Sequence, residues 1–166
     1  SGKTTLGGAL ARTLPGVWVE ELLREFCDRE GRTPTRDEQH RLMRAQIERE
    51  TLALARARRE GVSFVIFDST PLVTALYSVE LFGDDSLLER ALEHQRGYAA
   101  TLRTAIDLPW EADGIQRDGP QARASFDARL ARTLNDRGIA FTTIEGELPR
   151  RLALALDAVR GLAHVL

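Results

Sequence analysis

The stretch SGKTTLGGAL, residues 1–10, joins a short polar motif directly to a segment with the periodicity of a helix. Its apolar side chains recur at helical spacing, at Leu6, Ala9 and Leu10. The segment stops at Pro15 and Gly16, a pair that ends helices because proline lacks an amide donor and glycine tolerates a positive φ. The sequence therefore predicts a helix over residues 4–14 that begins directly behind Ser-Gly-Lys-Thr.

The tetrapeptide Ser-Gly-Lys-Thr matches the last defined positions of the phosphate-binding loop G-x-x-x-x-G-K-[ST]. In such a loop, Gly2 would let the backbone approach a phosphate and Lys3 would reach the β- and γ-phosphates. The Thr4 hydroxyl would ligate Mg²⁺, and the amides at the start of the helix would face the anion. We therefore expect ATP and Mg²⁺ as cofactors, with these binding residues: Ser1, Gly2, Lys3, Thr4 and Thr5.

Lys3 is the only lysine in the chain, because every other basic side chain is arginine. A compact ammonium on a flexible stem fits inside a tight phosphate cradle, where a planar guanidinium is too wide. The exception thus falls at the one position where the two side chains differ chemically. The alternative is a common helix start with a solvated lysine.

The first glycine of the loop and the strand that should precede it are absent from the sequence. We expect the natural protein to begin earlier, with an apolar strand that ends in a G-x-x-x pattern. A further domain fused upstream is also compatible with this sequence.

The length and composition indicate one domain with a small-molecule partner. A chain of 166 residues can form one compact domain, residues 1–166, without disulfides or metals. Its 23 basic and 25 acidic side chains are interspersed, so there is no electrostatic footprint for nucleic acid or anionic lipid. Cys27 is the only cysteine, and no apolar run approaches the ~18 residues of a membrane span. We therefore expect a cytoplasmic protein that binds neither nucleic acid nor membranes.

A second decisive stretch is VSFVIF, residues 62–67, which is followed at once by Asp68. The β-branched and aromatic run predicts a strand buried on both faces of a parallel sheet. It ends in the hhhhD pattern of a Walker B strand, so Asp68 would lie beside the phosphate-binding loop. Its carboxylate would hold Mg²⁺, directly or through water, or would take a proton from an acceptor hydroxyl. The alternative is an aspartate that caps the next helix.

Helices and strands alternate along the rest of the chain. Further strands are predicted at residues 17–19, 103–108 and 139–144, and helices at residues 20–30, 35–61, 71–82, 85–100, 126–138 and 149–166. Thr35 and Glu38 match the spacing of a capping box at the start of the longest helix. The alternation implies crossover connections, and hence an α/β fold with a mainly parallel sheet and helices on both faces.

Residues 109–123 break this alternation, because they hold prolines, glycines and charges without periodicity. An exposed loop next to a phosphate site has the form of a lid that closes over the transferring group. Arg117 and Arg123 lie in or beside this loop, and we expect at least one of them to stabilise charge in the transition state. The alternative for either one is a solvated surface arginine.

A charged cluster follows the predicted strand at residues 17–19: Glu20, Glu21, Arg24 and Glu25. Arg24 and Glu25 are candidates for contacts with the acceptor, Glu25 through ribose-type hydroxyls. The alternative, which the spacing supports equally well, is ion pairing on a solvated helix face.

Four stretches of the chain resemble, in order and spacing, the P-loop kinase family that includes the ribosylnicotinamide kinase domain of NadR-type NAD-salvage proteins. They are SGKTTL, LREFCDREG, FVIFDST and DLPWEADGIQRDGP, the last followed by Arg123 and Phe126. The resemblance covers nearly the whole chain, and the P-W-x-x-D-G-x-R pattern is its most family-specific part. Arg117 stands one position later than the arginine of that pattern.

This resemblance implies a nucleoside-kinase-like P-loop fold of three αβα layers, with its first strand missing from the chain. It also implies ATP and Mg²⁺ as the donor system and a ribosyl 5′-hydroxyl, such as that of nicotinamide riboside, as the acceptor. The residues matched to catalysis are Lys3, Asp68, Arg117 and Arg123. Those matched to the acceptor are Arg24, Glu25 and Asp113, and those matched to the metal are Thr4 and Asp68. When the resemblance is aligned on the segment Arg24-Glu25-Phe26, the aromatic side chain that binds the ring in the family falls near Glu20. Trp18 does not stand at that position.

The sequence thus leads to two hypotheses. The first is a kinase that transfers the γ-phosphate of ATP to the hydroxyl of a small nucleoside-like acceptor. The second is a sensor module that binds ATP, hydrolyses it slowly or not at all, and passes a conformational change to a fused domain. The phosphate-binding loop fits both, since many NTPases share it, AAA family ATPases among them.

Overall fold

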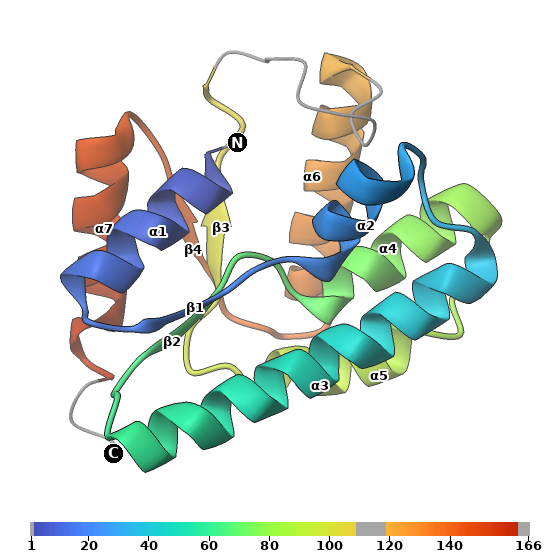
Figure 1. Cartoon of the computed structure of the whole chain (residues 1–166). Coiled ribbons are helices and arrows are strands. Elements are labelled where there is room, and N and C mark those ends of the chain that lie inside the picture. The colour runs from blue at the N-terminus through green and yellow to red at the C-terminus, as the bar shows by residue number, and fades with distance from the viewer. Residues whose placement is uncertain (1, 109–118, 163–166) are drawn as a thin grey trace.

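The computed structural model of the chain describes residues 2–108 and 119–162 (Figure 1). Within these residues, helices alternate with short strands in the order α1 (Lys3–Thr13), β1 (Val17–Val19), α2 (Leu22–Glu30), α3 (Arg36–Glu60), β2 (Val65–Phe67), α4 (Pro71–Phe82), α5 (Leu88–Arg96), β3 (Leu102–Thr104), α6 (Pro120–Asp136), β4 (Thr142–Ile144) and α7 (Leu148–Arg160). The predicted α/β alternation is confirmed. None of the described helices combines the length and the apolarity that a membrane span requires.

The start and the end of α3 follow the predicted signals. The Thr35 side chain accepts from the Glu38 amide, and the Glu38 carboxylate accepts from the Thr35 amide, which completes the capping box. Gly61 ends the helix with a φ of 68°, a left-handed conformation that glycine adopts without strain. Local sequence therefore fixes the length of the longest described helix.

The strands form two separate parallel pairs, whereas the sequence predicts one mainly parallel sheet. β1 pairs with β2 and β3 pairs with β4. Residues of β2 and of β3 both line one cavity of about 1450 Å³, which lies between the pairs. β2 and β3 share no backbone ladder in the part of the chain that the structure describes. The strand expected ahead of Ser1 stays a prediction.

The edges of several elements differ from the sequence prediction. β2 begins only at Val65, because the Val62 amide still donates to the Ala57 carbonyl at the end of α3. The residues of β2 are half-buried, so the prediction of a strand buried on both faces is wrong. α5 begins at Leu88 rather than near residue 85, because the Asp84 carboxylate accepts from the Ser86 amide in a turn.

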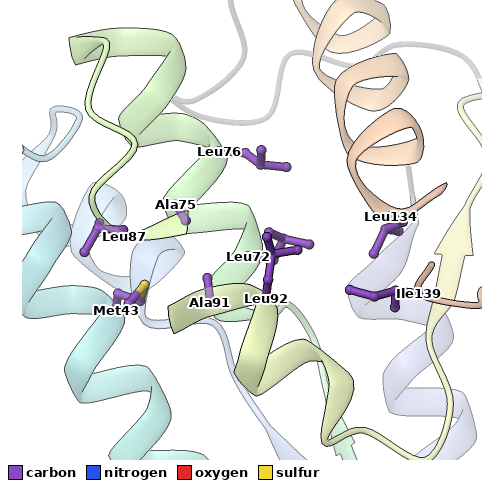
Figure 2. Packing of buried hydrophobic residues seen from close by; sticks show 9 residues of the cluster. All are labelled: Met43, Leu72, Ala75, Leu76, Leu87, Ala91, Leu92, Leu134 and Ile139. Carbon is purple, nitrogen blue, oxygen red and sulfur yellow. The ribbon is translucent and has the colours of Figure 1, made fainter. Parts of the chain in front are cut away.

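Helices lie on both sides of the strands, with α1 and α7 on one side and α3, α4 and α5 on the other (Figure 1). Figure 2 shows the core cluster that joins α3, α4 and α5 to α6 and the segment after it: Met43, Leu72, Ala75, Leu76, Leu87, Ala91, Leu92, Leu134 and Ile139. A second cluster packs α1 against β4 and α7: Leu6, Leu10, Ile144 and Ala155. Burial of these side chains fixes α1 and α4, the two helices that begin at the candidate site.

Gly7 of α1 gives a stability test of this packing. A Cβ at residue 7 would lie 1.8 Å from Cζ3 of Trp18, whereas a Cβ at Gly8 would meet only Nη1 of Arg12, at 3.5 Å. We expect Gly7→Ala to lower the free energy of unfolding by about 1–3 kcal/mol, because the Trp18 ring must move. The matched control Gly8→Ala should raise it by up to ~1 kcal/mol, since alanine favours helix. Urea denaturation measures both changes, and equal effects of the two variants would contradict the packing.

Candidate functional site

The start of α1 has the properties of an anion site. Gly2 is the N-cap residue and has a φ of 71°, in the left-handed region that favours glycine. No described side chain caps the helix, and its first turn contains no acidic residue. The first amides of a helix lack intrahelical partners and carry partial positive charge. Gly2, Lys3, Thr4 and Thr5 therefore form a helix start that is open to an anion.

Three elements converge on Thr4. Its hydroxyl donates to Oδ2 of Asp68 at 2.8 Å, and Nη1 of Arg24 donates to the Thr4 oxygen at 3.3 Å. Asp68 follows β2 and Arg24 belongs to α2. The predicted proximity of Asp68 to the phosphate-binding motif is thus confirmed, and Arg24 lies at the same point.

Asp68 has an unsatisfied oxygen at this point. The residue is only 9% exposed, and its Oδ1 is buried without a hydrogen-bond partner among the described residues. Burial raises the pKa of its carboxyl group; Lys3 and the Thr4 hydroxyl oppose this rise, and the Glu21 carboxylate adds to it. A cation beside Oδ1 would supply a partner and favour the ionised form. The Thr4 and Asp68 oxygens therefore fit Mg²⁺.

Two further observations bear on the role of Asp68. The N-cap residue of α4 is Thr70, so the alternative in which Asp68 caps that helix is wrong. Among residues 2–108 and 119–162, no three His, Cys, Asp or Glu side chains gather in a way that could hold a metal. Mg²⁺ is usually held by one or two protein oxygens together with phosphates and water, which is consistent with this small donor set.

Glu21 is a functional candidate that the sequence left unassigned within its charged cluster. Its carboxylate lies 3.7 Å from Nζ of Lys3, its side chain is only 12% exposed, and it lines the cavity. Glu20, the neighbouring residue, is exposed. The contrast between two adjacent glutamates depends on the turn between β1 and α2, which sequence spacing alone does not specify.

The two predicted acceptor residues of α2 separate in the structure. Arg24 lines the cavity, whereas Glu25 is not among the described residues that line it. Glu25 instead forms a two-pronged ion pair with Arg49 of α3. Successive residues of a helix point in different directions, about 100° apart, so one side chain faces the site and the other faces α3.

Arg123 also lines the cavity and has an unsatisfied nitrogen. Its Nη1 donates to the Leu108 carbonyl at 3.3 Å, and its Nη2 is buried without a hydrogen-bond partner among the described residues. The predicted loop at residues 109–123 ends earlier than expected, because α6 begins at Pro120, where the fixed φ of proline suits the first turn. Arg123 therefore projects from a helix rather than from a lid. Three further predicted site residues lie outside the described residues: Ser1, Asp113 and Arg117.

Aromatic side chains line the cavity beyond Asp68. The rings of Tyr77 in α4 and Phe126 in α6 stack with centroids 4.2 Å apart and an interplanar angle of 18°. Leu23 and Cys27 of α2 contribute apolar wall nearby. Trp18, the aromatic residue considered from the sequence, packs against Gly7 and is not among the described residues that line the cavity. Tyr77 and Phe126, but not Trp18, therefore contribute aromatic surface to the cavity.

The comparisons with known proteins agree with the phosphate-binding motif at the family level. The family model described as an AAA domain matches residues 1–151. A comparison with curated proteins finds no matching relative. The matched segment includes the start of α1, Asp68 and every other candidate site residue described above. The chain therefore belongs to the AAA domain family, whose members are nucleotide-binding proteins of the P-loop type.

Proposed function

We propose that this protein is an ATP-dependent kinase that transfers the γ-phosphate to a hydroxyl of a small nucleoside-like acceptor, with nicotinamide riboside as a candidate. One observation carries the proposal. The 2.8 Å hydrogen bond between Thr4 and Asp68 joins the phosphate-binding helix to a buried carboxylate, and both residues line the same cavity as Arg24 and Glu21. An ATPase needs room only for water beside the γ-phosphate, whereas a kinase needs room for an acceptor.

The sequence resemblance and the cavity walls support the same proposal. The resemblance to the ribosylnicotinamide kinase domain implies a nucleoside-kinase-like fold of three αβα layers, and the helices on both sides of the strands are compatible with it. The apolar and aromatic walls at Leu23, Tyr77 and Phe126 suit a ring better than a sugar alone. We therefore favour a nucleoside-like acceptor over a purely polar one.

The donor side is assigned to Lys3, Thr4, Asp68, Arg24 and Arg123. Lys3 neutralises the phosphates, and Thr4 and Asp68 would hold Mg²⁺, which supplies further charge neutralisation when bound. Arg24 lies within hydrogen-bond distance of Thr4, and Arg123 has a buried nitrogen that lacks a partner. Both guanidinium groups are thus candidates to stabilise the charge that develops on the transferring phosphoryl group.

The acceptor side is assigned to Glu21. Because Asp68 is assigned to Mg²⁺, the second carboxylate that lines the cavity near Lys3 is proposed as the base. Glu21 takes the hydroxyl proton while the acceptor oxygen bonds to the γ-phosphorus and the bond to the bridging oxygen of ADP breaks. The proton then passes from Glu21 to solvent.

Replacing Glu21 with glutamine tests this assignment. We expect Glu21→Gln to lower kcat by about 10²-fold and to leave ATP binding within a fewfold of the wild type, because the amide cannot accept the proton. Coupled-enzyme kinetics over a range of pH measure kcat, and titration with a fluorescent ATP analogue measures ATP binding. The matched control is Glu20→Gln, at the exposed neighbour, which should change neither. Equal kinetics of the two variants would remove Glu21 from the mechanism.

The AAA domain match keeps the ATP-sensing module as a second candidate function. The two functions differ in whether an acceptor gains phosphate. The full-length protein is incubated with ATP, Mg²⁺ and a panel of nucleosides that includes nicotinamide riboside, and the products are read by mass spectrometry. A phosphomonoester supports the kinase. Tight ATP binding without any phosphorylated nucleoside supports the sensor.

A further inference from the structure

Arg151 is a buried arginine that the proposed reaction does not use. It lies in the first turns of α7 and is only 1% exposed. Its Nε donates to the Gly146 carbonyl at 2.6 Å, and its Nη2 donates to the Ala105 carbonyl at 3.2 Å. The same Nη2 pairs with the Asp107 carboxylate. One guanidinium therefore ties the segment after β3 to the turn between β4 and α7.

The same guanidinium lies against the phosphate-binding motif. A Cβ on Gly2 would come within 3.6 Å of Nη1 of Arg151 and within 3.3 Å of Cδ1 of Leu108. Arg151 and Leu108 thus pack close to Gly2, the residue whose left-handed φ sets the direction of the chain into α1. A shift of Arg151 would remove part of the surface against which the motif rests.

The charge of Arg151 is partly offset at this point. Asp107 lies in direct contact with the guanidinium and offsets its charge. Asp107 also accepts from the Gly146 amide at 2.5 Å, and this bond together with Arg151 lowers the pKa of its carboxyl group, so that it stays ionised. Arg151, Asp107 and Gly146 therefore contact one another beside Gly2.

We propose that Arg151 is a positioning residue for nucleotide binding, which holds Gly2 and the start of α1 in register with the carboxyl ends of β3 and β4. An ion pair whose arginine is buried and whose carboxylate is partly exposed is a weak source of stability, because desolvation of the guanidinium offsets much of its Coulomb energy. A planar fork that joins three backbone or carboxylate acceptors next to a phosphate-binding loop instead fixes geometry. The inference rests on the nucleotide-binding part of the proposed function and not on phosphoryl transfer.

The test compares ATP affinity in Arg151 variants of the full-length protein with that of controls. Arg151→Met removes the fork, and Arg151→Lys keeps the charge but not the fork. Titration with a fluorescent ATP analogue, at a temperature where melting curves show every variant folded, gives each Kd. We expect both variants to weaken binding by about tenfold or more, because lysine does not restore the geometry. Arg150→Met, at the exposed neighbour that pairs with Glu145, should leave the Kd within about twofold.

A control for stability alone is Leu92→Ala, in the core cluster of α5. It should lower the melting temperature and leave the Kd unchanged. If Arg151→Met also binds ATP like the wild type while its melting temperature falls, Arg151 is a stabilising residue only and the proposal is wrong. If Arg151→Met does not fold, Asp107→Asn replaces it, with weakened ATP binding expected and an unchanged Kd counting against the proposal. A wild-type protein that binds no ATP would instead overturn the proposed function itself.

Discussion

The Lys3→Met variant should lose phosphoryl transfer by about 10³-fold or more in kcat/KM, because no other described lysine or arginine occupies the first turn of α1. In the proposed mechanism, Lys3 neutralises phosphate charge as the γ-phosphoryl group leaves. The nearest described acid, Glu21 at 3.7 Å, would lose its cationic neighbour in the variant. Initial rates at several ATP concentrations measure the effect.

Lys3→Arg tests whether charge alone is sufficient. This variant keeps the positive charge but replaces a compact ammonium with a wide, planar guanidinium, so we expect it to remain at least about 10²-fold impaired. Arg12→Met, at the exposed far end of α1, is the control and should retain full activity. A Lys3→Arg enzyme with wild-type turnover would mean that the size of the side chain does not explain why a lysine, rather than an arginine, stands at position 3. A fully active Lys3→Met enzyme would place the site elsewhere.

The elements that the sequence predicted well are those set by local chemistry. The capping box at Thr35 and Glu38 and the glycine at residue 61 fix both ends of α3. The hhhhD pattern predicted that Asp68 follows a strand, and the carboxyl end of β2 does lie beside the start of α1. The ends of α3 depend on short stretches of sequence alone, whereas the contact between Asp68 and Thr4 joins residues 64 positions apart.

The elements that the sequence missed depend on contacts between distant segments. Glu25 faces Arg49 while Glu21 faces Lys3, and only the packing of α2 between the site and α3 decides which glutamate points where. The split into two strand pairs likewise has no local signature, since the residue pattern of a strand does not specify which strand lies beside it. The role of Arg151 could not be predicted for the same reason, because its hydrogen-bond acceptors lie five to 46 positions away in the sequence.

Asp68→Asn should abolish most activity without destabilising the protein. The amide retains an acceptor for the Thr4 hydroxyl but cannot provide the charge that Mg²⁺ prefers, so we expect kcat to fall by about 10²-fold or more. Stability should respond in the opposite direction from activity. Burial raises the pKa of Asp68 in the folded protein, so the folded state binds more protons than the unfolded state as Asp68 titrates. The free energy of unfolding then falls as pH rises through that interval, and at neutral pH the ionised carboxylate is a net cost.

Asp84→Asn is the matched control, because Asp84 has the opposite shift. The Arg36 guanidinium, together with Ser86 and His40, lowers the pKa of Asp84, so its ionised form stabilises the fold above the ordinary pKa of aspartate and loses this effect in acid. Urea denaturation at neutral pH, without nucleotide or metal, should therefore give an equal or higher free energy of unfolding for Asp68→Asn and a lower one for Asp84→Asn. A buried carboxylate that costs stability at the point where α1, α2 and β2 meet is consistent with a role in ligand binding. If Asp68→Asn instead unfolds as readily as Asp84→Asn, Asp68 is a structural partner of Thr4, and the metal assignment loses its physical basis.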